Sequence, residues 1–214
     1  MRKIVILSIF ITLIAGAASG QMSIGAGFLY DYNANNGIKS EPLDMKFGRN
    51  NTSFGGFVFF DISFVELNIN YSYGTLKPYI KGNTITIDPP EELKMSQLGL
   101  SIYAKYKLNL GKISLFPMAG VEYNIALAVR DAHGNDLYAN SATKKAFRDY
   151  SQFGLLGGVG LDIPFTPKIF LRAEALFHFR FPSKDARAIA ETRDDYNITY
   201  GVGPRLKLGI GYRL

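Results

Sequence analysis

The chain has 214 residues, no cysteine, and a formal net charge of +6. The lack of cysteine excludes disulfides, thiolate metal sites and a lipid attached through cysteine. Beyond residue 20 no apolar run is long enough for a transmembrane helix, which excludes a helical membrane protein, while 16 Phe, 13 Tyr and 22 Gly favour an all-β chain.

The first twenty residues are predicted to be a secretory signal peptide. Arg2 and Lys3 form a positive segment, residues 4–17 are apolar, and residues 18–20 are small, as at a cleavage site. The apolar run is shorter than the roughly 20 residues of a membrane-spanning helix, and an uncleaved anchor is the alternative. We expect a signal peptide over residues 1–20 and a single barrel domain over residues 21–214.

Eight segments are predicted to be strands, because apolar and polar side chains alternate along them with a period of two. The second of these segments is nearly all apolar, so its two faces stay unassigned. Pro117 and Pro204 fall inside predicted strands, where each removes a ladder hydrogen bond, and we expect a bulge or a local break at each. The predicted strands are 22–30, 53–60, 64–73, 95–108, 113–127, 150–163, 168–181 and 198–214.

The connections between these strands alternate in length. Four are long and polar, at residues 31–52, 74–94, 128–149 and 182–197, and three are short, at residues 61–63, 109–112 and 164–167. This asymmetry is typical of a transmembrane antiparallel up-and-down β-barrel, with four long extracellular loops and three short periplasmic turns.

Glycines indicate which face of the sheet points inward. A solvent-exposed surface does not need small side chains, whereas the narrow interior of an eight-stranded barrel does. The polar face is therefore predicted to line the lumen and the apolar face to contact lipid, with aromatic residues near both ends of the strands. The glycines on the polar face are Gly99, Gly120, Gly154, Gly158, Gly160, Gly201, Gly203, Gly209 and Gly211.

The predicted lumen carries charged residues with a basic excess, seven basic side chains against four acidic ones. An enclosed excess makes no exposed basic stripe, so nucleic-acid binding is not expected. One interpretation is a salt-bridge network that holds the barrel shut, and the other is a narrow anion-preferring pore. The lumen residues are Glu66, Lys105, Lys107, Glu122, Asp162, Arg172, Glu174, His178, Arg180, Arg205, Lys207 and Arg213.

The last eight residues resemble the C-terminal assembly signal of bacterial outer-membrane barrels, through Lys207, Gly209, Tyr212 and Leu214. Leucine stands where a terminal phenylalanine is commoner. The whole mature chain resembles the small eight-stranded outer-membrane proteins, the OmpX, OmpA transmembrane-domain and opacity-like group. The resemblance implies an integral protein of the bacterial outer membrane, with the barrel assembly machinery, periplasmic chaperones and outer-membrane lipid as partners. It brings no catalytic residue and no cofactor.

Catalytic and metal chemistry find little support in the pattern. His178 has no neighbouring nucleophile and falls on the lumen face, so a hydrogen-bonded interior histidine is expected. The loop around His133 lacks the Gly and Glu of a calcium loop, and no metal site is predicted. A barrel that presents its loops to a host or surface ligand is the leading hypothesis. A narrow channel for small solutes is the alternative, with inward Phe116, Met118 and Phe170 leaving room for apolar solutes, and a lipid-modifying enzyme is third.

Overall fold

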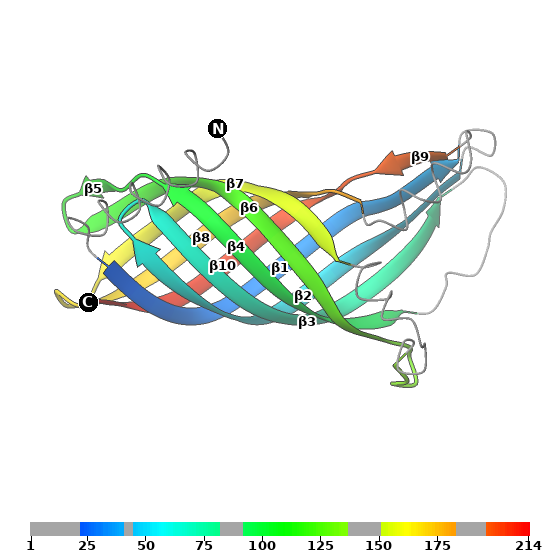
Figure 1. Cartoon of the computed structure of the whole chain (residues 1–214), viewed down its shortest axis with the longest axis horizontal. Helices are drawn as coiled ribbons and strands as arrows, with labels where there is room; N and C mark the ends of the chain where they lie inside the picture. The colour runs from blue at the N-terminus through cyan, green and yellow to red at the C-terminus, as the bar shows by residue number, and fades with distance from the viewer. Residues whose placement is uncertain (1–21, 41–44, 82–91, 137–150, 183–195) are drawn as a thin grey trace, which may run out of the picture.

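The computed structural model describes residues 22–40, 45–81, 92–136, 151–182 and 196–214, and these form a single β-barrel (Figure 1). Eight strands build its wall, and two short strands, β5 and β9, extend β4 and β10 beyond brief interruptions. The bounds are β1 Met22–Ser40, β2 Met45–Ile62, β3 Val65–Lys81, β4 Leu93–Lys105, β5 Leu108–Leu110, β6 Ile113–Arg130, β7 Gln152–Pro164, β8 Ile169–Arg180, β9 Tyr196–Thr199 and β10 Gly201–Arg213.

Every strand pairs antiparallel with its neighbours, in the order β10-β8-β7-β6-β4-β3-β2-β1. The circuit closes where β1 pairs with β10, from Ser23 opposite Arg213 to Ala34 opposite Val202. Closure satisfies the ladder hydrogen bonds of both strands that would otherwise be sheet edges. The predicted eight-stranded antiparallel barrel is confirmed.

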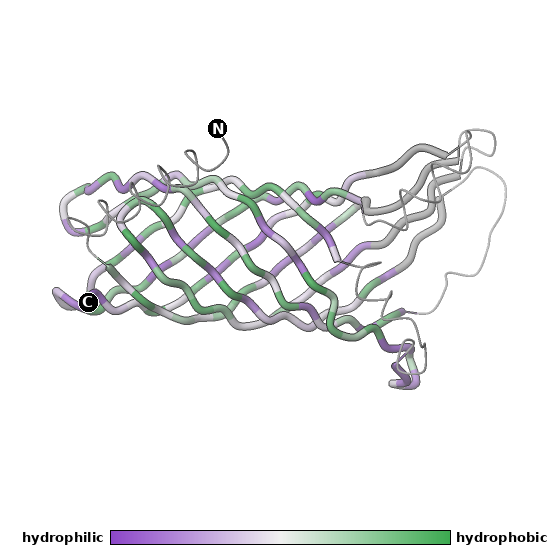
Figure 2. Tube along the Cα trace, in the orientation of Figure 1, coloured by the Kyte–Doolittle hydropathy of each residue, from purple (hydrophilic) through white to green (hydrophobic). Residues whose placement is uncertain are grey.

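The two faces of the wall have the predicted chemistry, and hydropathy alternates along the strands (Figure 2). Large apolar side chains point outward, including Phe28 at 81% exposure and Ile210 at 58%. Glycines on the inner face make room for rings, because a Cβ on Gly160 or Gly211 would overlap the ring of Phe116 or Phe170. Small residues therefore allow large side chains to fill a narrow interior.

Strand 53–60, whose faces the sequence left unassigned, obeys the same alternation. Phe57 and Phe59 are buried inside the barrel, while Phe54 and Val58 are exposed on its outer face. Phe57, Phe59 and Phe170 form one apolar cluster with Leu29.

Two of the segments predicted to be long loops consist largely or partly of strand. Most of the segment 31–52 is strand, because β1 continues to Ser40 and β2 begins at Met45, with Ser40 opposite Met45. Likewise β3 continues to Lys81, well into the segment 74–94. A spanning strand needs about 9–11 residues, so β1, β2 and β3, at 19, 18 and 17 residues, exceed that length. Together with β9, which pairs with β1, they form a projecting sheet at one end of the barrel (Figure 1).

The two prolines lie at gaps in the ladder, with no register shift at either. Pro117 faces the interruption between β4 and β5, where its carbonyl accepts the Tyr106 N–H at 3.2 Å. Pro204 lies between the paired residues Arg205 and Val202 on the β1 side, where bridges are missing over two positions. The prediction is therefore confirmed as a local break, and a bulge is wrong for both prolines. The expected signal peptide lies outside the described residues.

Candidate functional site in the barrel interior

A lower ion cluster fills the barrel near the short-turn end. It contains three carboxylates, Asp61, Glu66 and Asp162, and three cations, Lys105, Lys107 and Arg172. All of them are buried except Lys107, whose side chain is 29% exposed. Charges this far from water are costly unless they are paired and hydrogen-bonded, so their mutual contacts are a condition for the barrel to fold.

Arg172 is the centre of the lower ion cluster. Its guanidinium donates to both Asp162 oxygens at 2.7 and 2.8 Å, to Glu66 Oε2 at 2.8 Å and to Asp61 Oδ2 at 2.8 Å. Arg172 lies on β8 and Glu66 on β3, half-way around the circuit of eight strands. The bond between them therefore crosses the full width of the lumen.

Aromatic rings enclose the same guanidinium. Its central carbon lies 4.2 Å from the ring centroid of Phe59, 5.0 Å from that of Phe116 and 5.2 Å from that of Phe170. Rings at these distances attract a cation through their quadrupole and leave no space for water beside it. Lys105 completes the layer by donating to Asp61 and, at 2.9 Å, to Glu66.

An upper ion cluster lies closer to the long-loop end. Arg180 donates to Glu122 at 2.8 Å and to Asp31 at 2.6 Å. Arg205 contacts the same two carboxylates, at 2.8 Å from Glu122 and 3.2 Å from Asp31. The four residues come from β6, β8, β10 and β1, and since β6 and β1 are half-way around the circuit from each other, the upper ion cluster also joins opposite walls.

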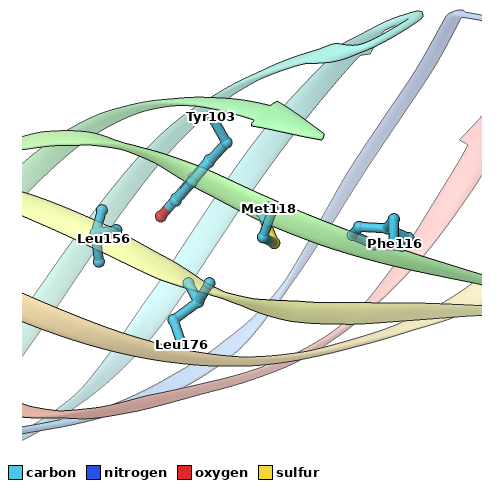
Figure 3. Close-up of a cluster of buried hydrophobic side chains, with 5 residues drawn as sticks. All are labelled: Tyr103, Phe116, Met118, Leu156 and Leu176. Atoms are coloured by element: carbon cyan, nitrogen blue, oxygen red, sulfur yellow. The ribbon is translucent and has the colours of Figure 1, made fainter. Parts of the chain in front are cut away.

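Lys207 and Glu174, which are 3.3 Å apart, form an ion pair that lies between the two clusters. The Lys207 ammonium also donates to the Tyr103 hydroxyl at 3.2 Å. Tyr103 belongs to an apolar cluster from β4, β6, β7 and β8, and its side chain points inward with those of Phe116, Met118, Leu156 and Leu176 (Figure 3). Phe116, Met118 and Phe170, which the sequence placed inward, are thus packed against other side chains.

Charge balance is the main correction to the predicted lumen. Asp31 and Asp61 had been assigned to a loop and a turn, but both are buried interior carboxylates. The basic excess disappears with them, since six carboxylates face six cations in the described interior. Continuing the alternation of each strand would have found both residues: Asp31 is two positions beyond inward Leu29, and Asp61 two beyond inward Phe59.

Arg213 does not join either ion cluster. It is half-buried at the end of β10, donates to the Pro167 carbonyl at 3.2 Å and lies 5.4 Å from the Phe170 ring centroid. Because β10 ends there, the alternation that placed Arg213 inside takes it to the rim. The predicted assembly signal is divided between the faces: Lys207 and Gly209 point inward, and Tyr212 and Leu214 are exposed outside.

His178 is an interior histidine of the upper ion cluster, with Nδ1 3.2 Å from Asp31 Oδ1. Within the described ranges no group of three or more His, Asp or Glu residues is arranged to hold a metal. His133 lies on an exposed turn in which Asp131 accepts from the backbone and side-chain N–H groups of Asn135 at 2.8 and 3.0 Å. These bonds hold the pKa of Asp131 below its ordinary value.

In the part of the chain that the structure describes, no helix is long and apolar enough to cross a membrane. Solved structures nevertheless match this fold over most of its length. OprG from Pseudomonas aeruginosa is 13% identical, with a TM-score of 0.51, and the match covers 91% of this chain and 96% of OprG. The neisserial surface protein NspA is 14% identical, with a TM-score of 0.49, over 90% of this chain and 97% of NspA. Identities this low show the fold alone.

Sequence comparison gives the family. No curated protein matches the chain in sequence. The family model described as "Outer membrane protein beta-barrel domain" matches residues 4–213, which is nearly the whole chain. With its closed antiparallel barrel and apolar outer face, the protein is an integral β-barrel of the bacterial outer membrane and belongs to this outer-membrane β-barrel family.

Proposed function

We propose that this protein is a sealed barrel that holds a projecting sheet and its loops at the cell surface for interaction or adhesion. The main support for a sealed interior is Arg172 on β8, which bonds Glu66 on β3 across the lumen and is surrounded by aromatic rings. A conducting path at this level would have to displace a guanidinium that makes four hydrogen bonds.

The balance of charge also supports a sealed interior. A charge-selective pore lines its path with an excess of one sign. Here three carboxylates face three cations in the lower ion cluster and two face two in the upper one, with Lys207 and Glu174 between them. The interior therefore offers neither anions nor cations a favourable place to replace their hydration water. The hypothesis of an anion-preferring pore required an excess of basic residues in the lumen, and the described interior has none.

The projecting sheet supports the interaction role. Strands β1, β2 and β3 continue past the length needed to cross the membrane, and β9 pairs with the extension of β1. Recognition usually resides on surface segments that a rigid scaffold positions. We propose that a ligand binds here, through the segments 31–52, 74–94, 128–149 and 182–197, of which the first is largely sheet.

Planar-bilayer conductance of the refolded protein tests the sealed interior. We expect no stable channels from the wild type. Stable channels with steady conductance would contradict the proposal and support the narrow solute channel.

Exchange of the surface segments tests the interaction role. Replacing residues 36–49 with a tight two-residue turn removes the projecting hairpin and keeps Asp31, so that both ion clusters stay intact. We expect the variant to keep the heat-modifiable gel migration of a folded barrel and to lose adhesion of expressing cells to host-cell or matrix surfaces. Adhesion that survives replacement of all four segments would contradict this role.

The assembly machinery, periplasmic chaperones and outer-membrane lipid remain proposed partners. Tyr212 and Leu214 are 42% and 67% exposed on the outer face, so an assembly factor could contact them. Lys207 is buried in the folded barrel, so an assembly factor would have to contact it before β1 pairs with β10 and closes the barrel.

A further inference from the structure

A single extra residue in β6 changes which side chains face outward near the extracellular end. Below this point Gln97 is opposite Ala126, and above it Ser96 is opposite Ala128, so Leu127 is the additional residue of a β-bulge. The bulge moves Val129 into the interior, where it is 2% exposed, and turns Arg130 outward. Bulges often re-aim a side chain near a functional site.

The re-aimed Arg130 lies directly opposite Lys94 on β4, and both side chains are exposed on the outer face. Like charges opposite one another in an antiparallel pair destabilise the sheet. A regular β6 would have avoided this by placing Val129 opposite Lys94. The bulge thus creates a cost that an anion between the two cations would remove.

The nearby carboxylates of the described residues have other contacts. Glu92, two residues before Lys94, is bound to Lys77 at 2.8 Å. Asp131 is bonded to Asn135 within the turn, and Asp136 is opposite Arg130 across an isolated backbone bridge. Within the described residues Lys94 forms no ion pair.

The position of the two cations indicates the source of the anion. Tyr73 is opposite Ser96, two residues further into the membrane than Lys94, and is 46% exposed on the lipid-facing side. A tyrosine at this depth marks the membrane–water interface, so Lys94 and Arg130 lie at the height of lipid headgroups.

We propose that Lys94 and Arg130 bind the phosphate of a phosphorylated glycolipid in the outer leaflet, with the Leu127 bulge turning Arg130 to the lipid-facing side opposite Lys94. Arg and Lys are the usual ligands of phosphate in proteins. Each contributes about 1 kcal/mol of binding free energy near an anionic lipid surface. The proposal depends on the family and the fold, and it does not need the surface-ligand role or a sealed lumen.

The test uses full-length mature protein, refolded into phosphatidylcholine nanodiscs with and without lipid A, which carries two phosphates. Native mass spectrometry measures how much lipid A each protein retains. We expect Lys94→Gln and Arg130→Gln each to weaken retention about fivefold, and the double variant roughly thirtyfold. Lys77→Gln is the matched control, because Lys77 is a neighbouring rim cation already paired with Glu92, and it should stay within about twofold of the wild type.

A second measurement separates binding from folding. In phosphatidylcholine alone the double variant should melt at the same temperature as the wild type or higher, since the like-charge repulsion is gone. Adding lipid A should raise the melting temperature of the wild type and leave that of the double variant unchanged. Equal retention by the wild type and the double variant would overturn the proposal.

Two further arms identify the source of the phosphate. Lipid A from which both phosphates have been removed should not be retained above the level of the double variant. Inorganic phosphate added to the protein in a zwitterionic detergent should not raise its melting temperature. Stabilisation by free phosphate equal to that by lipid A would overturn the assignment to a lipid.

Discussion

The two ion clusters of the lumen share their chemistry but differ in how they cross the barrel. The lower ion cluster spans the diameter, because Arg172 on β8 bonds Glu66 on β3. The upper ion cluster also joins opposite walls, since β6 and β1 are half-way around the circuit from each other, but it does so in two steps, through guanidinium groups that each bind Glu122 and Asp31. The strands β2, β3 and β4 at that end present neutral side chains such as Ser53, Ser72 and Gln97. Equal charge balance is therefore organised around one central guanidinium in the lower ion cluster and shared between two guanidinium groups in the upper one.

This difference suggests that stability depends more on the lower ion cluster. Arg172 makes four hydrogen bonds and contacts three rings, whereas Arg180 makes two hydrogen bonds to carboxylates that Arg205 also contacts. A guanidinium with more buried partners leaves more of them unpaired when it is removed.

The largest effect is expected from Arg172→Ala. The substitution leaves three buried carboxylates with only Lys105 and Lys107, so the free energy of unfolding should fall by about 3–5 kcal/mol. Urea unfolding in detergent micelles, followed by heat-modifiable gel migration, measures the change. A loss below about 1 kcal/mol would show that the lower ion cluster is not the main closure.

Arg180→Ala should cost less, about 1.5–3 kcal/mol, because Arg205 still contacts Asp31 and Glu122. The same urea titration provides the number. If Arg180→Ala proved as costly as Arg172→Ala, the sharing of Asp31 and Glu122 between Arg180 and Arg205 would have no energetic effect.

Packing around the lower ion cluster can be tested without changing charge. A Cβ on Gly160 meets the buried ring of Phe116, whereas a Cβ on Gly157, on the outer face of the same strand, meets nothing within 4 Å. Gly160→Ala should therefore cost about 1–3 kcal/mol and the control Gly157→Ala close to nothing. Equal midpoints for the two variants in urea would indicate that the interior is loosely packed.

The smallest effect is expected outside both clusters, in the exposed turn after β6. Asn135→Ala removes the side-chain hydrogen bond, the largest cause of the lowered pKa of Asp131, and keeps the backbone bond, so that pKa should rise part of the way toward its ordinary value. The ionised Asp131 carboxylate stabilises the turn at any pH above its unfolded pKa, and this stability is lost as pH falls through the lowered pKa of the folded turn. Because the folded pKa is higher in the variant, its turn should open at a higher pH. An NMR titration of the Asp131 carboxyl measures the shift, and the barrel's urea midpoint should not change.

Much of the fold could be predicted because alternation is a local property of each strand. The face on which Glu66, Glu122 and Arg172 lie was predictable from the alternation of their neighbours, and the structure places all three inside. Predicted strand ends failed where polarity was taken as a sign of a loop: Asp31 opens a polar stretch, yet β1 continues to Ser40. A carboxylate can lie on a buried strand when cations from other strands face it, and no local pattern contains that information.

The pattern of residues by itself determined the architecture, because period-two alternation, inner-face glycines and alternating connection lengths together allow only a closed membrane barrel. The tertiary structure alone decided the pairing of charges. Asp61, Glu66, Asp162 and Arg172 are spread over more than one hundred residues and meet only when β1 closes on β10. It also decided that Lys94 faces Arg130, because one bulge residue shifts the register that the alternating pattern implies. Local chemistry dictates which face a side chain joins, whereas its partner depends on register and closure, which are properties of the whole sheet.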